Sequence, residues 1–163
     1  MASSRSGWSA GSRPVIAWFS QLLRRLGSLF RRGHADDDGA DTELREVFFA
    51  ELDDVTQTLE RAFSIWRENN TDEAALKDLR RGFHTIKSSA HLVGEQPLGD
   101  FCRHFEQLAI RLMDKQAKVT PAIVVSVDQA VAVLPAFAKA IREGRAPPPQ
   151  AVVLGNRVQR LLG

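Results

Sequence analysis

The chain contains a single cysteine, and it lacks the run of about 18 apolar residues that a transmembrane helix needs. Cys102 alone cannot form an internal disulfide, which excludes a disulfide-stapled domain and favours a reducing compartment. The apolar stretch 15–19 is too short for a secretory signal, because Arg24 and Arg25 soon interrupt it. We therefore expect a cytoplasmic protein with one main domain.

Acidic residues are absent from the first 35 positions, which carry six arginines. Since the whole chain has a net charge of +2, residues 36–163 carry a net charge of −4. Apolar residues recur with helical spacing beside the arginines of residues 14–32, which predicts a basic amphipathic helix. Such a helix suits an anionic surface, here the inner membrane, and it suits a partner helix or a neighbouring domain equally well. Residues 1–40 are interpreted as a flexible leader, this helix and an acidic linker at 34–40.

Helical periodicity dominates residues 41–143, where no segment alternates apolar and polar residues as a strand does. Apolar residues recur every three or four positions in four stretches, which are separated by start and stop signals. These signals are Asp41 or Thr42, Asp72, Gly94, and Thr120 followed by Pro121. Four amphipathic helices with short connections predict an all-α fold, an antiparallel four-helix bundle.

Two further features modify this simple bundle. Pro135 lies inside the fourth helical stretch, where it predicts a kink because proline cannot donate a backbone hydrogen bond. Residues 144–163 begin with the proline-rich break GRAPPPQ and continue as a helical pattern. We therefore expect a short C-terminal helix after the bundle.

The second helix carries His84 on its polar face. At about 100° per residue, the apolar positions of this helix lie on the side opposite His84. Basic or polar residues lie within about 60° of His84 on either side. They are Lys77, Arg80, Arg81, Lys87, Ser88 and His91. His84 is therefore expected to face solvent within a band of positive charge.

The segment His84-Thr85-Ile86-Lys87-Ser88, followed by Gly94, resembles the phosphoacceptor motif of histidine phosphotransfer (HPt) domains. That family is usually written His-x-x-Lys-Gly, so Ser88 stands where glycine is usual. The resemblance implies that His84 is the phosphoacceptor and that Lys87 neutralises the incoming phosphate. It also implies that a small side chain at position 88 lets the aspartate pocket of a partner come close.

The third helix extends the resemblance. Phe105-Glu106-Gln107-Leu108 resembles the Glu-Asn-Leu element of HPt domains in chemotaxis-type kinases, which implies that Glu106 orients the imidazole of His84. Arg103 stands where flagellar chemotaxis kinases tend to have a second histidine. Residues 41–48, 78–84 and 132–135 look like the HPt repeats of the chemosensory kinases that control type IV pili and twitching motility.

The resemblance implies a bacterial phosphorelay protein that carries a phosphoryl group on His84 between a kinase or receiver and a receiver aspartate. Nothing in the sequence resembles an ATP-binding kinase domain, so the chain is expected to pass phosphate on without hydrolysing ATP. No cofactor is expected, because the receiver would hold the metal. The residues expected to dock the receiver or kinase are Lys77, Arg80, Arg81, Ser88, His91 and Arg103.

Three alternatives stay open. The first is an HPt-like interaction module that docks receivers or kinases without efficient transfer, and Ser88 and Arg103 favour it. The second is a metal site built from His84, His91 and His104, although zinc ligands are normally closer in sequence and have no cation such as Lys87 between them. The third is nucleic-acid binding by the basic N-terminal segment, which is not expected because the segment has no reading motif.

Overall fold

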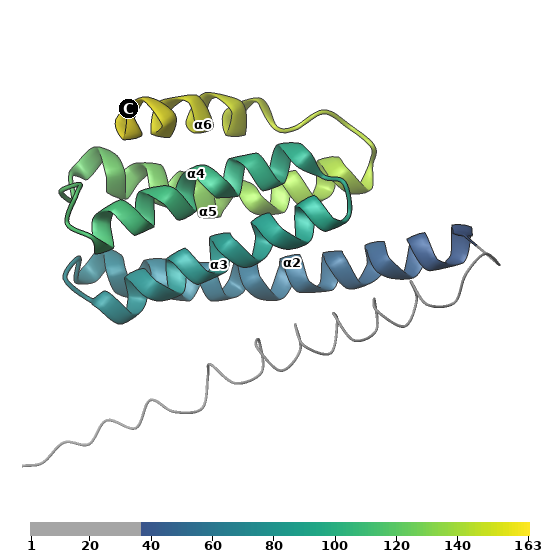
Figure 1. Cartoon of the computed structure of the whole chain (residues 1–163), viewed down its shortest axis with the longest axis horizontal. Helices are drawn as coiled ribbons and strands as arrows, with labels where there is room; N and C mark the ends of the chain where they lie inside the picture. The colour runs from purple at the N-terminus through teal and green to yellow at the C-terminus, as the bar shows by residue number, and fades with distance from the viewer. Residues whose placement is uncertain (1–36) are drawn as a thin grey trace, which may run out of the picture. The chain divides into compact units, whose positions relative to one another are not determined.

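The computed structural model describes residues 37–163, and within them it contains five helices and no strand. The helices are α2 (Asp37–Glu68), α3 (Glu73–Leu92), α4 (Gln96–Met113), α5 (Pro121–Arg142) and α6 (Pro149–Leu162). Leu44–Gly163 form one compact unit in which α2 to α5 make the predicted four-helix bundle (Figure 1). The short C-terminal helix α6 packs outside the bundle, against α4 and α5. The amphipathic helix predicted at 14–32 lies outside the described residues.

The predicted start and stop signals lie at the ends of the helices. The carboxylate of Asp72 accepts a hydrogen bond of 2.8 Å from the backbone N–H of Ala75 and caps α3. Thr120 caps α5 by accepting from the backbone N–H of Ile123 at 3.3 Å. After α3, Gly94 has a φ of +83°, a left-handed conformation that glycine adopts without strain.

The start of α2 differs from the prediction. The helix begins at Asp37 rather than at Asp41 or Thr42, so residues 37–40 are helical and do not belong to a linker. The helix therefore extends further toward the N-terminus than the start signals at Asp41 and Thr42 indicated. The sequence prediction placed the charge change correctly but treated the acidic run as a break.

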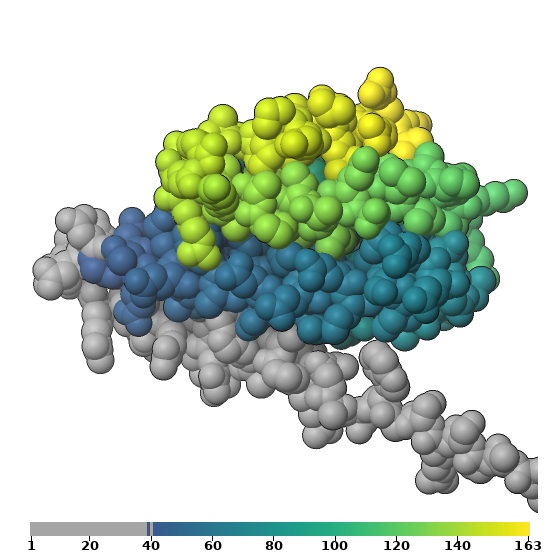
Figure 2. Space-filling view, turned by 180° about the vertical axis from the view of Figure 1, so that it is seen from behind, coloured from purple at the N-terminus to yellow at the C-terminus, as the bar shows by residue number. Residues whose placement is uncertain are grey.

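The fourth bundle helix, α5, continues through Pro135 as far as Arg142. By length and mean hydropathy alone, this helix could cross a membrane. The sequence analysis did not predict this, because polar and charged residues interrupt the apolar run of the helix. Half of its apolar window is nevertheless buried in the protein, as expected for the core helix of a bundle. Seen from the opposite side, α5 lies between α2 and α6 (Figure 2).

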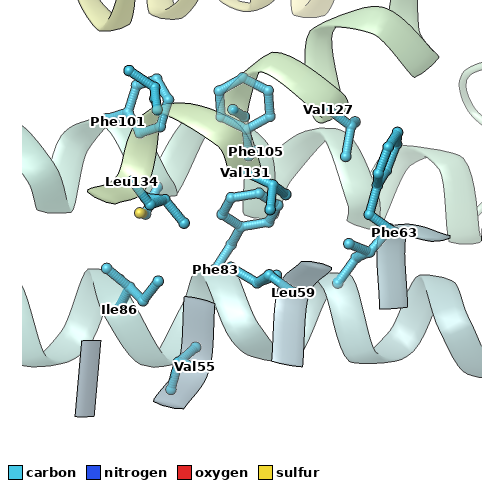
Figure 3. Packing of buried hydrophobic residues seen from close by; sticks show 14 of the residues in the cluster. Val55, Leu59, Phe63, Phe83, Ile86, Phe101, Phe105, Val127, Val131 and Leu134 are labelled. Atoms are coloured by element: carbon cyan, nitrogen blue, oxygen red, sulfur yellow. The ribbon is translucent and has the colours of Figure 1, made fainter. Parts of the chain in front are cut away.

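The core is built from side chains of all four bundle helices. Figure 3 shows Val55 and Leu59 of α2 facing Phe83 of α3, with Phe105 of α4 and Val131 of α5 above them. Phe83 and Phe105 stack with their ring centroids 5.3 Å apart, and both are almost fully buried. Aromatic pairs in this geometry stabilise a core beyond the area they bury. This stack fixes the register between α3 and α4, the two helices that carry the predicted site.

Candidate functional site

His84, Lys87 and Glu106 form one hydrogen-bonded group across α3 and α4. Nδ1 of His84 lies 2.6 Å from Oε1 of Glu106, and Nζ of Lys87 donates to Oε2 at 2.7 Å. His84 and Glu106 each directly follow one of the two stacked phenylalanines, so the buried ring pair sets their separation. The connection between α3 and α4 is only three residues long, which holds the two helices side by side.

The three side chains differ in exposure. The side chain of His84 is 53% exposed, that of Lys87 is 23% exposed, and that of Glu106 is only 8% exposed. The carboxylate therefore forms the base of the site and the imidazole forms its surface. Because Nδ1 is held by Glu106, Nε2 is the nitrogen that remains for a reaction with a partner.

The charge state of Glu106 decides the tautomer of His84. Burial by itself raises the pKa of Glu106, but the hydrogen bonds from Lys87 and His84, together with their charges, outweigh it and lower the pKa. Glu106 is therefore ionised at neutral pH and can only accept hydrogen bonds. A neutral imidazole must then carry its proton on Nδ1, which leaves the lone pair on Nε2.

Ser88 occupies the position where the resembled motif has glycine. Its hydroxyl donates a hydrogen bond of 2.9 Å to the backbone carbonyl of His84, one turn earlier in α3. The hydroxyl is thus bound to the helix backbone instead of projecting from it. The side chain adds little bulk beside His84, in agreement with the need for a small residue there.

Other predicted docking residues lie near the group but outside it. Arg81, exposed on α3, lies 3.8 Å from Asp78, one turn away. Arg103, at the position of the second histidine in the resembled kinases, pairs with Asp100 at 3.4 Å. It belongs to the surface of α4 and forms no hydrogen bond to His84 in the described structure.

Lys77 and Arg80 have no carboxylate partner among residues 37–163. Lys77 is exposed, whereas Arg80 is half-buried. The Nε atom of Arg80 is fully buried and has no hydrogen-bond partner in the described part of the chain. The positive band predicted around His84 therefore contains paired and unpaired cations.

Sequence reasoning missed the residues that position His91. A Cβ atom on Gly99 would lie 2.2 Å from the His91 ring, so this ring packs directly on the backbone of α4. Its Nε2 lies 3.8 Å from Oδ1 of Asp100. The spacing of Asp100 and Arg103 on one helix indicates their pairing, but no sequence signal identifies Gly99 as the contact of His91.

The three histidines of the metal alternative do not form a metal site. No group of three or more histidine, cysteine or acidic residues within residues 37–163 is placed to hold a metal ion. His104 lies against α6 instead, with Nδ1 buried 3.7 Å from the position of a Cβ on Gly155. Burial, followed by the charge of Arg103, lowers the pKa of His104 and favours its neutral form.

Comparisons with known proteins agree with this geometry. The family model described as Hpt domain matches residues 43–144, which cover more than half of the chain and most of α2 to α5. The matched region contains His84, Lys87 and Glu106. A search of curated proteins gives no match.

Proposed function

Because this chain belongs to the Hpt domain family, whose members carry out histidine phosphotransfer in phosphorelay signalling, we propose that His84 accepts and passes on the phosphoryl group. The observation that carries this proposal is the 2.6 Å contact between Nδ1 of His84 and the carboxylate of Glu106. It selects the tautomer in which Nε2 is nucleophilic, on a ring that is half exposed to partners.

Transfer to this protein requires one bond to form and one to break. The lone pair on Nε2 attacks the phosphorus of the donor, and the bond from phosphorus to the donor oxygen breaks with its electron pair leaving on that oxygen. The imidazole of His84 becomes cationic because Nδ1 keeps its proton. The carboxylate of Glu106 stabilises this positive charge, as a carboxylate behind a histidine does in hydrolytic triads. Transfer to a receiver aspartate reverses these steps.

Lys87 has a double role in this proposal. Its ammonium group donates one hydrogen bond to Glu106 and helps to keep that carboxylate ionised. Lysine has three N–H donors, so two remain for the oxygens of a phosphoryl group on His84. Lys87 therefore both orients the network and binds phosphate.

Hpt domains interact with receiver and kinase domains. We propose that the partner here is an acidic receiver pocket, because α3 presents a band of cations around His84. This band comprises Lys77, Arg80, Arg81 and Lys87. The association rate should fall steeply as salt is raised, since exposed charges are screened over about 8 Å at physiological ionic strength.

The test is to incubate the protein with a phosphorylated receiver domain and measure acid-labile phosphate on the chain. Wild type should acquire the label, whereas His84→Gln should acquire none. His104→Gln is the matched control, because His104 lies against α6 and is not among the predicted docking residues, so this variant should keep the label. Retention of the label by His84→Gln would overturn the assignment. Receiver binding without any label on wild type would favour the non-transferring module.

The cellular setting is a separate proposal. The segments 41–48, 78–84 and 132–135 support a chemosensory system of the type IV pilus kind, and the single cysteine supports a cytoplasmic location.

For residues 14–32, an anionic membrane surface or a partner helix would provide the matching surface. Co-sedimentation of the full chain and of a chain starting at residue 36 with vesicles containing anionic lipid tests the membrane proposal. Salt-sensitive binding of the full chain alone would support it. Equal binding of the two chains to the vesicles would contradict it.

A further inference from the structure

Arg80 differs from the other cations around His84 because one of its N–H donors, Nε–H, is buried and has no hydrogen-bond partner in the described part of the chain. It lies one turn before His84 on the same side of α3 and is half-buried. Its buried Nε–H group has no hydrogen-bond acceptor among residues 37–163, and no carboxylate of these residues lies within 4.0 Å of its guanidinium. A buried donor without a partner is uncommon and calls for an explanation, such as a ligand that completes it.

The neighbouring cations are already committed. Lys87 donates to Glu106, and Arg103 pairs with Asp100. Arg81 follows Arg80 directly but lies near the carboxylate of Asp78. Within the described structure, Arg80 is thus the half-buried cation of this face whose charge is not balanced by a carboxylate.

A phosphoryl group on His84 would bring charge that the existing network does not balance. The positive charge of Lys87 is matched by the negative charge of Glu106 at 2.7 Å. A phosphoryl group carries up to two negative charges near neutral pH, as phosphorylated side chains do. Arg80, one turn before His84 on α3 and without a carboxylate partner in the described residues, is available to balance this additional charge.

The helix places the two residues at a suitable separation. Cβ atoms four residues apart on one helix face lie about 5–6 Å from each other. The arginine side chain is long enough to span this separation, and its planar fork can give two parallel N–H bonds to phosphate oxygens. Lysine at the same position would supply charge without this fork.

We propose that Arg80 binds the phosphoryl group on His84: its guanidinium turns outward from its half-buried position and donates from Nε–H and from one terminal N–H to two phosphoryl oxygens. This assignment rests on the proposed function of His84 as the phosphoacceptor. It differs from a docking role, in which Arg80 would act only when a receiver is present.

A small phosphodonor separates the two roles because no receiver takes part. Phosphoramidate transfers its phosphoryl group to Nε2 while its own phosphorus–nitrogen bond breaks and ammonia leaves. Arg80→Gln should lower the rate of labelling of His84 at least about tenfold, because a single hydrogen bond to a charged group accounts for about that factor and Arg80 supplies two. Arg157→Gln removes the same charge from an exposed position on α6, outside the docking band, and should label at the wild-type rate, whereas Arg80→Lys should fall between the two.

The N–H resonance of the Arg80 side chain gives a readout that does not depend on rate. In a ¹⁵N-labelled protein, phosphorylation by phosphoramidate should shift the Nε–H signal of Arg80. The Nε–H signal of Arg157 should change little. Circular dichroism and thermal melting of each variant identify any rate loss that comes from unfolding.

Equal labelling rates for Arg80→Gln and Arg157→Gln, or an Arg80 signal that phosphorylation leaves unchanged, would overturn the assignment. Either result would be seen on a protein whose His84 still accepts phosphate. If wild type itself takes no label on His84 from phosphoramidate or from a phosphorylated receiver, the proposed function fails instead. The two failures are therefore distinguishable.

Discussion

Glu51 on α2 allows a sharp test of how burial controls charge in this protein. Its side chain is buried, with 3% of the residue exposed, and neither carboxylate oxygen has a hydrogen-bond partner in the described structure. Burial raises its pKa from 4.5 to about 7, opposed only weakly by the hydroxyl of Ser89. That hydroxyl donates instead to the backbone carbonyl of Thr85 at 2.9 Å.

The raised pKa makes folding depend on pH in a defined direction. Below pH 4.5, Glu51 is protonated in both the folded and the unfolded state, so it adds no pH dependence. Between pH 4.5 and about 7, the unfolded chain loses the proton and the folded chain keeps it, so the free energy of unfolding falls as pH rises. Above pH 7, Glu51 is ionised in both the folded and the unfolded state, and the decrease in the free energy of unfolding has reached its full size. A difference of 2.5 pKa units corresponds to about 3 kcal/mol.

The perturbation is Glu51→Gln, which keeps the size of the side chain and removes its titration. The unsatisfied amide costs about 1–3 kcal/mol, but this cost is the same at every pH. Between pH 5 and pH 8, wild type should therefore lose about 2.5 kcal/mol more of its free energy of unfolding than the variant, because part of the full effect lies below pH 5. Other groups, His104 among them, titrate in both proteins and cancel in the difference.

Urea unfolding followed by circular dichroism at pH 5, 6, 7 and 8 measures these free energies. Glu60→Gln is the matched control, because Glu60 lies on the same helix but is exposed. Its pH profile should run parallel to that of wild type. Parallel profiles for wild type and Glu51→Gln would refute the reasoning, since they would show that Glu51 has the same pKa in the folded and unfolded chain.

Three further variants test the packing and the site. Gly82→Ala places a Cβ 2.6 Å from Leu59 and should destabilise the protein by about 1–3 kcal/mol, with Leu59→Ala relieving part of this loss in the double variant. If the free-energy changes of the two single variants, measured by urea unfolding, simply add up in the double variant, the contact between positions 82 and 59 is contradicted. Lys87→Gln should raise the pKa of Glu106 and lower phosphoramidate labelling about tenfold, and an unchanged rate would argue against its role. Arg111→Gln removes the donor to a carbonyl at the end of α6, so amide exchange there should speed up while global stability changes by only about 1 kcal/mol.

The exposure of His84 could be predicted from the sequence because it depends only on local geometry. A helix repeats every 3.6 residues, so an apolar stripe on one side of α3 places the opposite residues in solvent. The contact of His84 with Glu106 is of another kind, since it joins residues 22 positions apart. It depends on the register between α3 and α4, which periodicity does not define. The family resemblance supplied that register, and the 2.6 Å distance agrees with it.

The features that escaped prediction depend on neighbours in space. The apolar pattern of α2 indicated which face is buried, and Glu51 lies on that face between Phe48 and Val55. Nothing in the pattern showed that a carboxylate there would lack a partner. In the same way, no sequence pattern showed that Gly82 provides the room that Leu59 occupies.

Glu51 and Glu106 together show that cations, and not burial alone, decide which carboxylate is ionised here. Both residues are buried, at 3% and 6% exposure. Burial alone raises the pKa of each, yet the pKa of Glu51 is raised to about 7 and that of Glu106 is lowered. The difference is the pair of donors, Lys87 and His84, that Glu106 has and Glu51 lacks. Removing Lys87 should therefore move Glu106 toward the behaviour of Glu51, and His84 would lose the ionised acceptor that holds its proton on Nδ1.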